Sequence, residues 1–330
     1  MSTGGRGVWA RRGVLRFGRA MARALPVPAD LCALAASQEG LLSTRQCEAA
    51  GVGPARRSRL VRARRWARVI TGVYDVVPAR PRAPDASRRR AAWIGVLAYG
   101  PDAVAVGASA LALHGVNGLP ALVVPEVALP ARRYAPGRGD VRVRRFATSA
   151  VVLGHARVAP LPLALVQALP EMSRDHAVAV LDDVLHHRRL TGPELESVRA
   201  RTTGRRGAAR LHGCWALVDP RAESPLETFA RLRCVDGGVP PDAVQLVVRA
   251  PDGGFVGRCD LAWRRADGRW LLGEVDGREF HDVPHALHHD RRRQNALVAL
   301  GHTVLRFTAA DVATGAIATT IRTTLAAPNP

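Results

Sequence analysis

The sequence predicts a multi-domain protein of the α/β class. Its 330 residues are enough for two or three domains, and 47% of them are hydrophobic, which is typical of a globular chain. Near the N-terminus, short helical stretches precede a hairpin signal. The last third of the chain alternates helices and strands in the order α-β-β-β-α-β, which favours a mixed sheet covered by helices.

The charge balance is strongly basic, with a formal net charge of +20 and an isoelectric point near 11.5. Every basic side chain other than histidine is an arginine, because the sequence contains no lysine. Guanidinium groups match phosphate oxygens in bidentate fashion, and a large positive field attracts polyanions. A GC-rich genome explains arginine in place of lysine but not the surplus of charge. The sequence therefore predicts DNA as a partner.

The five cysteines are scattered along the chain and form no Cys-x-x-Cys pair. The sequence thus predicts neither a disulfide framework nor a zinc site, and it favours a reducing, cytoplasmic compartment. No apolar run approaches the roughly 18 residues of a membrane span, so we expect no membrane partner.

The first 77 residues divide into two parts. We expect residues 1–29 to be a basic disordered arm, and residues 30–77 to form a winged helix-turn-helix. Asp30 is placed to cap the first helix, and Ser43 or Thr44 the second.

The third helix of this module is the expected recognition helix. It runs over residues 54–64 with Pro54 in the first turn, where proline is tolerated. A hairpin turn at Thr71-Gly72, between strands at 66–70 and 73–77, supplies the wing. Four arginines of the helix are expected to project outward to DNA: Arg56, Arg57, Arg59 and Arg62. The alternative is a solvated basic helix in a small packing domain.

We expect a proline- and arginine-rich linker over residues 78–90 and an α+β middle domain over residues 91–210. Apolar periodicity predicts helices over 91–100, 109–114, 161–168, 177–185 and 193–200, and strands over 122–127 and 141–146. The histidines of this region have no metal-ligand spacing, so the middle domain indicates no chemistry of its own.

The C-terminal domain is expected over residues 211–330. Its predicted elements are a helix opened by Ser224-Pro225, strands over 246–249, 255–263, 270–276 and 303–307, and a helix over 286–300. The last helix crosses between the final two strands, which makes the sheet mixed.

Acidic residues on two of these strands are the best functional signal in the chain. In the strand over 270–276, Leu272, Glu274 and Asp276 share one face. Two acids on an otherwise apolar strand are costly to bury unless a cation or a strong donor meets them. Asp260 lies on the neighbouring strand. Oxygen ligands of this kind suit Mg²⁺ or Mn²⁺, so we expect Asp260 and Glu274 to bind such an ion.

This pattern resembles the PD-(D/E)XK nuclease core, in a restriction-endonuclease-like mixed sheet. It is similar to a family related to very-short-patch-repair (Vsr) endonucleases, which has a Ser-x-x-Glu helix, an Asp on a strand, Glu-x-Asp-Gly, a His and Asp-x-x-Arg. The matching residues here are Ser224, Glu227, Asp260, Glu274-Val275-Asp276-Gly277, His281, Asp290 and Arg293.

The resemblance implies a magnesium-dependent endodeoxyribonuclease. Its implied catalytic residues are Glu227, Asp260, Glu274, Asp276 and His281. His281 would be a general base or a phosphate contact, and Arg291, Arg293 and Arg306 would hold the phosphate. Ser224 with Glu227 is also a capping box, which needs no metal.

One departure from the family pattern counts against activity. The usual core has a lysine two residues after the glutamate, and Asp276 stands there instead. Three explanations stay open: His281 takes over the role, Asp276 binds a second cation, or the site is catalytically dead.

The N-terminal half resembles the AbiEi-type antitoxins of type IV toxin-antitoxin systems. Residues 41–46 (Leu-Leu-Ser-Thr-Arg-Gln), Trp66-Ala67-Arg68-Val69 and Gly72-Val73-Tyr74 resemble their winged-helix module, and residues 109–115 the domain that follows it. The sequence therefore favours a DNA endonuclease targeted by a winged helix. The alternative is a non-catalytic transcriptional regulator with a cognate nucleotidyltransferase-like toxin as partner.

Overall fold

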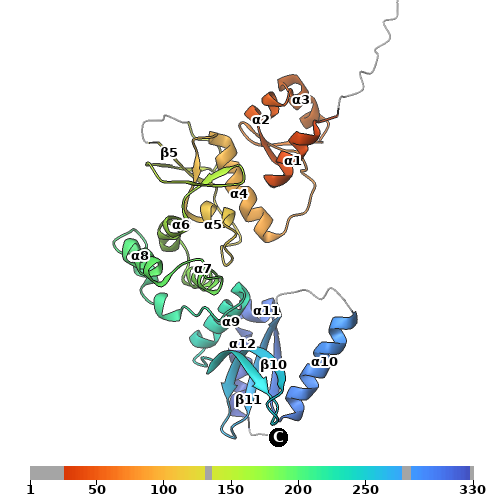
Figure 1. Cartoon of the computed structure of the whole chain (residues 1–330), viewed down its shortest axis with the longest axis vertical. Helices are drawn as coiled ribbons and strands as arrows, with labels where there is room; N and C mark the ends of the chain where they lie inside the picture. Colours follow the sequence, from red (N-terminus) through yellow and green to blue (C-terminus); the bar gives the residue numbers. More distant parts are fainter. Residues whose placement is uncertain (1–25, 131–135, 277–283, 328–330) are drawn as a thin grey trace, which may run out of the picture.

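The computed structural model describes residues 26–130, 136–276 and 284–327. These residues form a mixed α/β protein with three sheets, which lie one after another along the long axis of the molecule (Figure 1). The predicted α/β class is therefore confirmed. Residues 1–25 of the expected N-terminal arm lie outside the described residues, and so does His281.

The N-terminal domain has three helices and a three-stranded antiparallel sheet of order β1-β3-β2. Its elements are α1 (Ala29–Ser37), β1 (Leu41–Ser43), α2 (Thr44–Ala49), α3 (Pro54–Arg62), β2 (Ala67–Ile70) and β3 (Val73–Asp75). Leu31, Leu42, Leu60 and Trp66 pack between the helices and the sheet. The order of elements agrees with the sequence expectation for residues 30–77.

The helix ends of this domain correct one expectation and confirm another. Asp30 does not cap α1, because the helix already begins at Ala29 and its N-cap is Pro28. Ser43 does cap α2, in a reciprocal pair of bonds with Gln46. Helix α3 ends two residues before the expected position, at Arg62, since Arg64 has a left-handed φ of 55°.

The middle domain holds a five-stranded sheet of order β6-β5-β4-β8-β7. Its elements are α4 (Pro84–Tyr99), β4 (Val104–Ala105), α5 (Gly107–Leu113), β5 (Glu126–Leu129), β6 (Arg142–Arg145), β7 (Val151–Leu153), β8 (Ala156–Val158), α6 (Leu161–Ala168), η1 (Leu169–Glu171), α7 (Arg174–His186), α8 (Gly192–Thr202), η2 (Ala208–Leu211) and η3 (Trp215–Leu217). The expected linker is shorter than predicted, because α4 already begins at Pro84, a residue suited to a first helical turn. Arg90 on α4 pairs with the buried Asp75 at 2.8 Å and so fixes the helix to the N-terminal sheet.

The C-terminal domain is a four-stranded sheet of order β12-β11-β10-β9. Its elements are α9 (Pro225–Asp236), β9 (Ala243–Arg249), β10 (Phe255–Arg264), β11 (Trp270–Asp276), α10 (Pro284–Ala299), β12 (Thr303–Thr308), α11 (Ala309–Thr314) and α12 (Ala316–Ala326). The strands β11 and β12 are parallel and the other pairs antiparallel, as the crossing helix predicted. Leu271 packs in the core with α9, α11 and α12, and Leu272 packs on the opposite face with Leu297 of α10.

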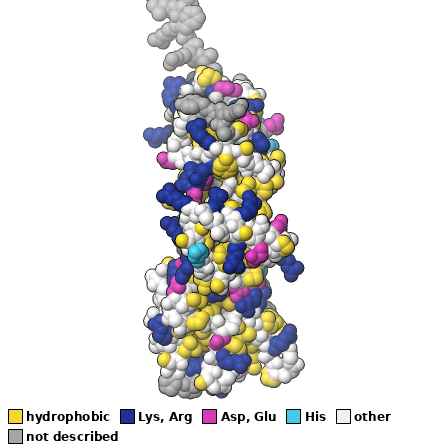
Figure 2. All heavy atoms as spheres, turned by 90° about the vertical axis from the view of Figure 1, so that its left-hand side faces the viewer, with side chains coloured by type: hydrophobic (Ala, Val, Ile, Leu, Met, Phe, Trp, Pro, Cys, Tyr) yellow, Lys and Arg dark blue, Asp and Glu magenta, His cyan; other side chains and the backbone are white. Residues whose placement is uncertain are grey.

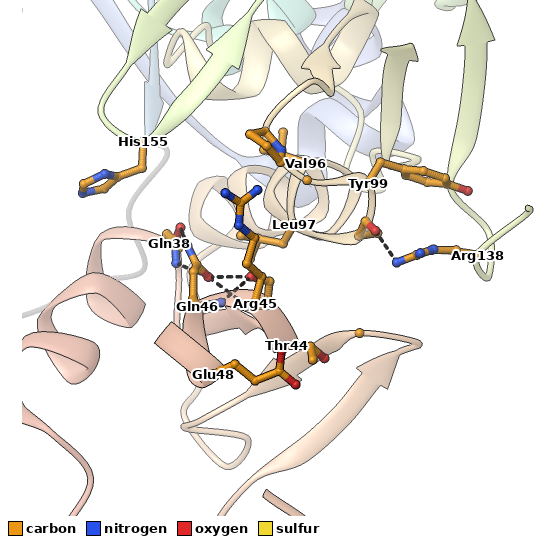
Figure 3. A pocket seen from close by; sticks show the side chains of 15 residues that line it. Gln38, Thr44, Arg45, Gln46, Glu48, Val96, Leu97, Tyr99, Arg138 and His155 are labelled. Carbon is orange, nitrogen blue, oxygen red and sulfur yellow. Dashed lines mark hydrogen bonds between the residues drawn. The ribbon is translucent and has the colours of Figure 1, made fainter. Parts of the chain in front are cut away.

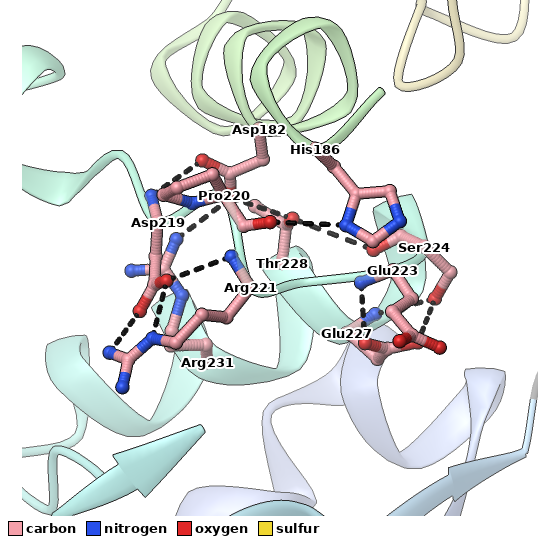
Figure 4. Close-up of polar contacts among 10 residues, drawn as sticks. All are labelled: Asp182, His186, Asp219, Pro220, Arg221, Glu223, Ser224, Glu227, Thr228 and Arg231. Carbon is pink, nitrogen blue, oxygen red and sulfur yellow. Dashed lines mark hydrogen bonds and ion pairs between the residues drawn. The ribbon is translucent and has the colours of Figure 1, made fainter. Parts of the chain in front are cut away.

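The middle core extends past residue 210, where the sequence placed the boundary. This core includes Leu211 and Cys214, and also Leu232, which lies on α9. Asp182 of α7 is fully enclosed and accepts bonds from the backbone N–H of Asp219 at 2.7 Å and from Thr228 and Arg231 of α9, each at 2.9 Å (Figure 4). Helix α9 is therefore bound to the middle domain as well as to its own sheet.

Candidate functional site: an acidic cluster on the C-terminal sheet

Three of the predicted acids lie on adjoining elements of the C-terminal domain. Glu227 is in the first turn of α9, Asp260 is on β10 and Glu274 is on β11. Glu227 and Glu274 are buried, whereas Asp276, at the end of β11, is exposed. The alternation predicted for β11 holds for Leu272 and Glu274, but the strand end leaves Asp276 in solvent.

Glu227 serves both the helix end and the cluster. The hydroxyl of Ser224 accepts a bond from the backbone N–H of Glu227 and donates to its carboxylate at 2.8 Å (Figure 4). The other carboxylate oxygen accepts from the backbone N–H of Glu223 at 2.8 Å and from the amide of Gln245 at 2.9 Å. Ser224 thus caps α9, but the expected capping box is not completed, because Glu227 accepts from the backbone N–H of Glu223 and not from that of Ser224.

Gln245 on β9 joins Glu227 to Asp260, and sequence reasoning missed it. Its amide nitrogen lies 2.9 Å from a Glu227 oxygen and 3.4 Å from an Asp260 oxygen. Its φ is 54°, a left-handed value that is rare for a non-glycine residue inside a strand. Such strain persists only where the surroundings hold it, and it gathers at functional sites. Gln245 is the one polar residue in the run from Ala243 to Val248, a signal that could have identified it.

The carboxyl group of Asp260 is in an unusual electrostatic environment. Burial raises its pKa to about 6, and the nearby charges of Glu227 and Glu274 act in the same direction. The backbone N–H of Val275 opposes this by donating to Asp260 at 2.8 Å. The raised pKa means that this side chain takes up a proton at a higher pH than an ordinary aspartate does.

Glu274 does not face an open site. One of its oxygens lies 2.6 Å from a guanidinium nitrogen of Arg293 on α10, and the other lies 3.1 Å from Nε of Arg306 on β12. Arg293 also donates to the carbonyl oxygen of Arg258 at 3.0 Å. The two arginines expected to hold a phosphate instead neutralise the expected metal ligand, because α10 and β12 flank β11.

Of the remaining predicted residues of this domain, the structure places only Arg291. Arg291 is exposed on α10. His281 lies outside the described residues, as does the side chain of Asp290.

The described acids of the cluster are held by donors of the protein itself. Among the residues that the structure describes, no three His, Cys, Asp or Glu side chains are grouped so that they could hold a metal ion. The space between Glu227 and Asp260 is bridged by an amide, and both oxygens of Glu274 are engaged by arginines. The predicted pair of Asp260 and Glu274 could bind Mg²⁺ or Mn²⁺ only after these donors withdraw.

The predicted DNA-contacting arginines of α3 are not equivalent. Arg57 is buried, which contradicts its predicted outward position: it donates to the carbonyl oxygen of Val52 at 2.8 Å and pairs with Glu48 at 3.0 Å. Arg56 is half-buried and donates to the carbonyl oxygen of Pro26. Arg59 and Arg62 are exposed, as expected. Arg57 points inward because it lies three residues before Leu60, on the buried face of α3.

A cavity of about 500 Å³ separates the N-terminal domain from α4 (Figure 3). The side chain of Arg45 lies between the two parts, beside the hydrogen-bonded pair of Gln38 and Gln46. Arg138 closes another side by donating to the carbonyl oxygen of Ala98. None of the predicted site residues lines this cavity.

The chain is a mixed α/β protein with three sheets, and its C-terminal sheet carries a cluster of partly buried carboxylates. No family model matches the chain. The chain is 32% identical over 246 residues to each of two proteins of Mycobacterium tuberculosis, the uncharacterised protein Rv2248 of strain H37Rv and the uncharacterised protein MT2308 of strain CDC 1551. The match covers 74% of this chain and 86% of each relative, so the chain belongs to the family of these mycobacterial proteins. In the described residues, no helix is long and apolar enough to cross a membrane.

Proposed function

We propose that this protein binds double-stranded DNA through α3 and the hairpin of β2 and β3, used as a winged helix. The supporting observation is a group of exposed arginines that pair with no acid among the described residues: Arg59, Arg62, Arg64 and Arg65. All four lie on α3 or in the turn that leads to the hairpin. Uncompensated guanidinium groups on a helix of this kind suit the phosphate backbone of DNA.

The alternative is a basic face that is merely solvated. Elsewhere in the same part of the chain, arginines are matched with acids: Arg57 with Glu48, and both Arg82 and Arg90 with Asp75. Figure 2 shows basic side chains covering more of the presented face than acidic ones. Charge that the protein does not neutralise internally is best explained by an external polyanion.

The salt dependence of DNA binding tests this proposal. Fluorescence anisotropy with a duplex of about 25 base pairs gives the association constant at several salt concentrations. Replacing Arg59 and Arg62 by glutamine should weaken binding and reduce the slope of log K against log salt by about 2, one for each lost phosphate contact. The matched control replaces Arg188 and Arg201, which are exposed in the middle domain. An equal loss in both variants would rule out α3 as the contact.

The cluster supports a non-catalytic regulator more directly than a nuclease. The observation is the pairing of Glu274 with Arg293 and Arg306, together with the missing lysine. A regulator of the AbiEi type would bind its own promoter, with a nucleotidyltransferase-like toxin as the cognate partner. Footprinting upstream of its own gene tests this proposal, and absence of any protected region would contradict it.

Metal-dependent cleavage of DNA is the second candidate. The strained Gln245, held between Glu227 and Asp260, favours it, since such strain is typical of functional sites. Nicking of supercoiled plasmid is measured with Mg²⁺, with Mn²⁺ and with a chelator. The nuclease proposal expects nicking that disappears with the chelator and in both Asp260→Ala and Glu274→Ala. No nicking, or nicking that survives these substitutions, would exclude it.

A further inference from the structure

The middle domain contains a second concentration of arginines, in a cavity of about 590 Å³. The cavity lies where β6, the end of α6 and η1 meet the turn that leads to η2. Its charged and polar lining residues are Arg142, Arg144, Gln167, Glu171, Arg205, Arg206 and Arg210. A cavity of this size accommodates a nucleotide-sized ligand or a short stretch of nucleic acid backbone.

The cavity has more positive charge than its own acids neutralise. Arg144 bonds both Glu126 and Glu171, and Arg142 bonds Glu171. These two arginines and two glutamates balance. The remaining three arginines, at positions 205, 206 and 210, are exposed, and none of the described acids forms an ion pair with them. Three such cations around one hollow give it a positive potential that attracts an anion.

The paired arginines are held in position by buried contacts. Glu126 is buried beneath Arg144, and burial raises the pKa of its carboxyl group although Arg144 opposes this. Each guanidinium has five N–H donors, so both arginines keep donors beyond those that the glutamates use. Gln167 adds an oriented amide, because its oxygen accepts from the backbone N–H of Gly107 at 3.0 Å. Its NH₂ group therefore remains as a donor at the cavity.

A glycine fixes the loop that bears two of the unpaired arginines. Gly207 has a φ of 92°, and a Cβ atom there would lie 2.1 Å from the carbonyl oxygen of Pro170. Only glycine allows this approach of the loop to η1. Arg205 and Arg206 precede this contact directly, so their backbone is anchored at the rim of the cavity.

We propose that this cavity is a binding site for phosphate groups. Guanidinium forks bind phosphate oxygens with two parallel bonds, and a fixed pair together with three adaptable arginines suits a ligand with several negative charges. The phosphate can belong to a free phosphorylated ligand or to the backbone of a nucleic acid. The proposal does not depend on DNA binding by α3.

Calorimetry of the full chain with inorganic pyrophosphate tests the site. Replacing Arg205, Arg206 and Arg210 together by glutamine should weaken pyrophosphate binding by at least about tenfold. The matched control replaces Arg157, Arg188 and Arg201, three exposed arginines that do not line the cavity, and should retain the wild-type affinity. Absence of pyrophosphate binding, or an equal loss in both triple variants, would overturn the proposal.

Two further measurements separate this site from α3 and identify the source of the phosphate. The variant lacking Arg59 and Arg62 should bind pyrophosphate as the wild type does. A duplex that displaces pyrophosphate identifies a nucleic acid backbone as the ligand, whereas a duplex that binds without displacing it identifies a free phosphorylated ligand.

Discussion

Replacing Asp260 by asparagine should make the folded protein more stable at neutral pH. The carboxyl group is enclosed among Gln245, Val275 and two other acids, so ionising it is unfavourable in the folded state. Asparagine has the same shape and can still accept the bond from the backbone N–H of Val275. The substitution therefore removes an unfavourable charge without leaving a cavity.

The magnitude follows from the pKa of Asp260. Burial raises it from an ordinary value of 3.8 to about 6, so the ionised form costs roughly 3 kcal/mol of folding free energy above pH 6. An amide donates a bond where the carboxylate accepted one, which removes part of the gain. We expect a net stabilisation of about 1–2 kcal/mol at pH 7.5. Below about pH 4 the carboxyl group is neutral in both the folded and the unfolded states, and the gain should vanish.

Urea unfolding of the wild type and of Asp260→Asn, measured from pH 4 to pH 7.5, is the assay. The wild type should lose stability relative to the variant as the pH rises from about 4 to about 6. Asp311→Asn is a control of opposite sign, because bonds from the backbone N–H and hydroxyl of Thr308 lower the pKa of Asp311. A difference between wild type and Asp260→Asn that does not change with pH would refute the electrostatic reasoning.

Two other substitutions test structural assignments. Arg57→Met should lower the free energy of unfolding by about 2 kcal/mol or more, because it leaves the carbonyl oxygen of Val52 without its donor. Arg59→Met, at an exposed position of the same helix, should change that free energy little, and urea unfolding compares the two variants. Gly207→Ala should lower the free energy of unfolding by about 2 kcal/mol or more, since the added Cβ would meet Pro170 and the φ of this residue is left-handed. The control is Gly213→Ala, at a position with open space around it. Equal melting temperatures of the two variants would show that the loop adjusts.

The sequence identified the elements of the C-terminal sheet because their signals are local. The strand over residues 270–276 was predicted with the bounds that it has, since turn residues flank both of its ends. The helix over 161–168 in the middle domain was also predicted with its bounds, and prolines lie near both of its ends. The short strands β4, β7 and β8, each of two or three residues, have too little periodicity to be predicted from a single sequence. Helices α11 and α12 were missed, although Ile317, Ile321 and Leu325 recur at helical spacing on the buried face of α12.

The candidate site was predicted in part. Period-two alternation correctly buried Glu274, and the capping pattern correctly joined Ser224 to Glu227. No local pattern, however, shows that Arg306 on β12 and Arg293 on α10 bond to Glu274, because those contacts depend on how the helix crosses the sheet. The partners of Arg57, the carbonyl oxygen of Val52 and the carboxylate of Glu48, likewise lie outside α3.

Helix α9 has a consequence for how the chain can be divided. Its Leu232 belongs to the core of the middle domain, while its Ala230 and Cys234 belong to the core beneath the C-terminal sheet. A truncation at residue 210 would strip the helix of one set of neighbours and leave Arg231 without Asp182. The middle and C-terminal parts are therefore expected to melt in one cooperative step, and a fragment meant to isolate either of them would have to keep α9.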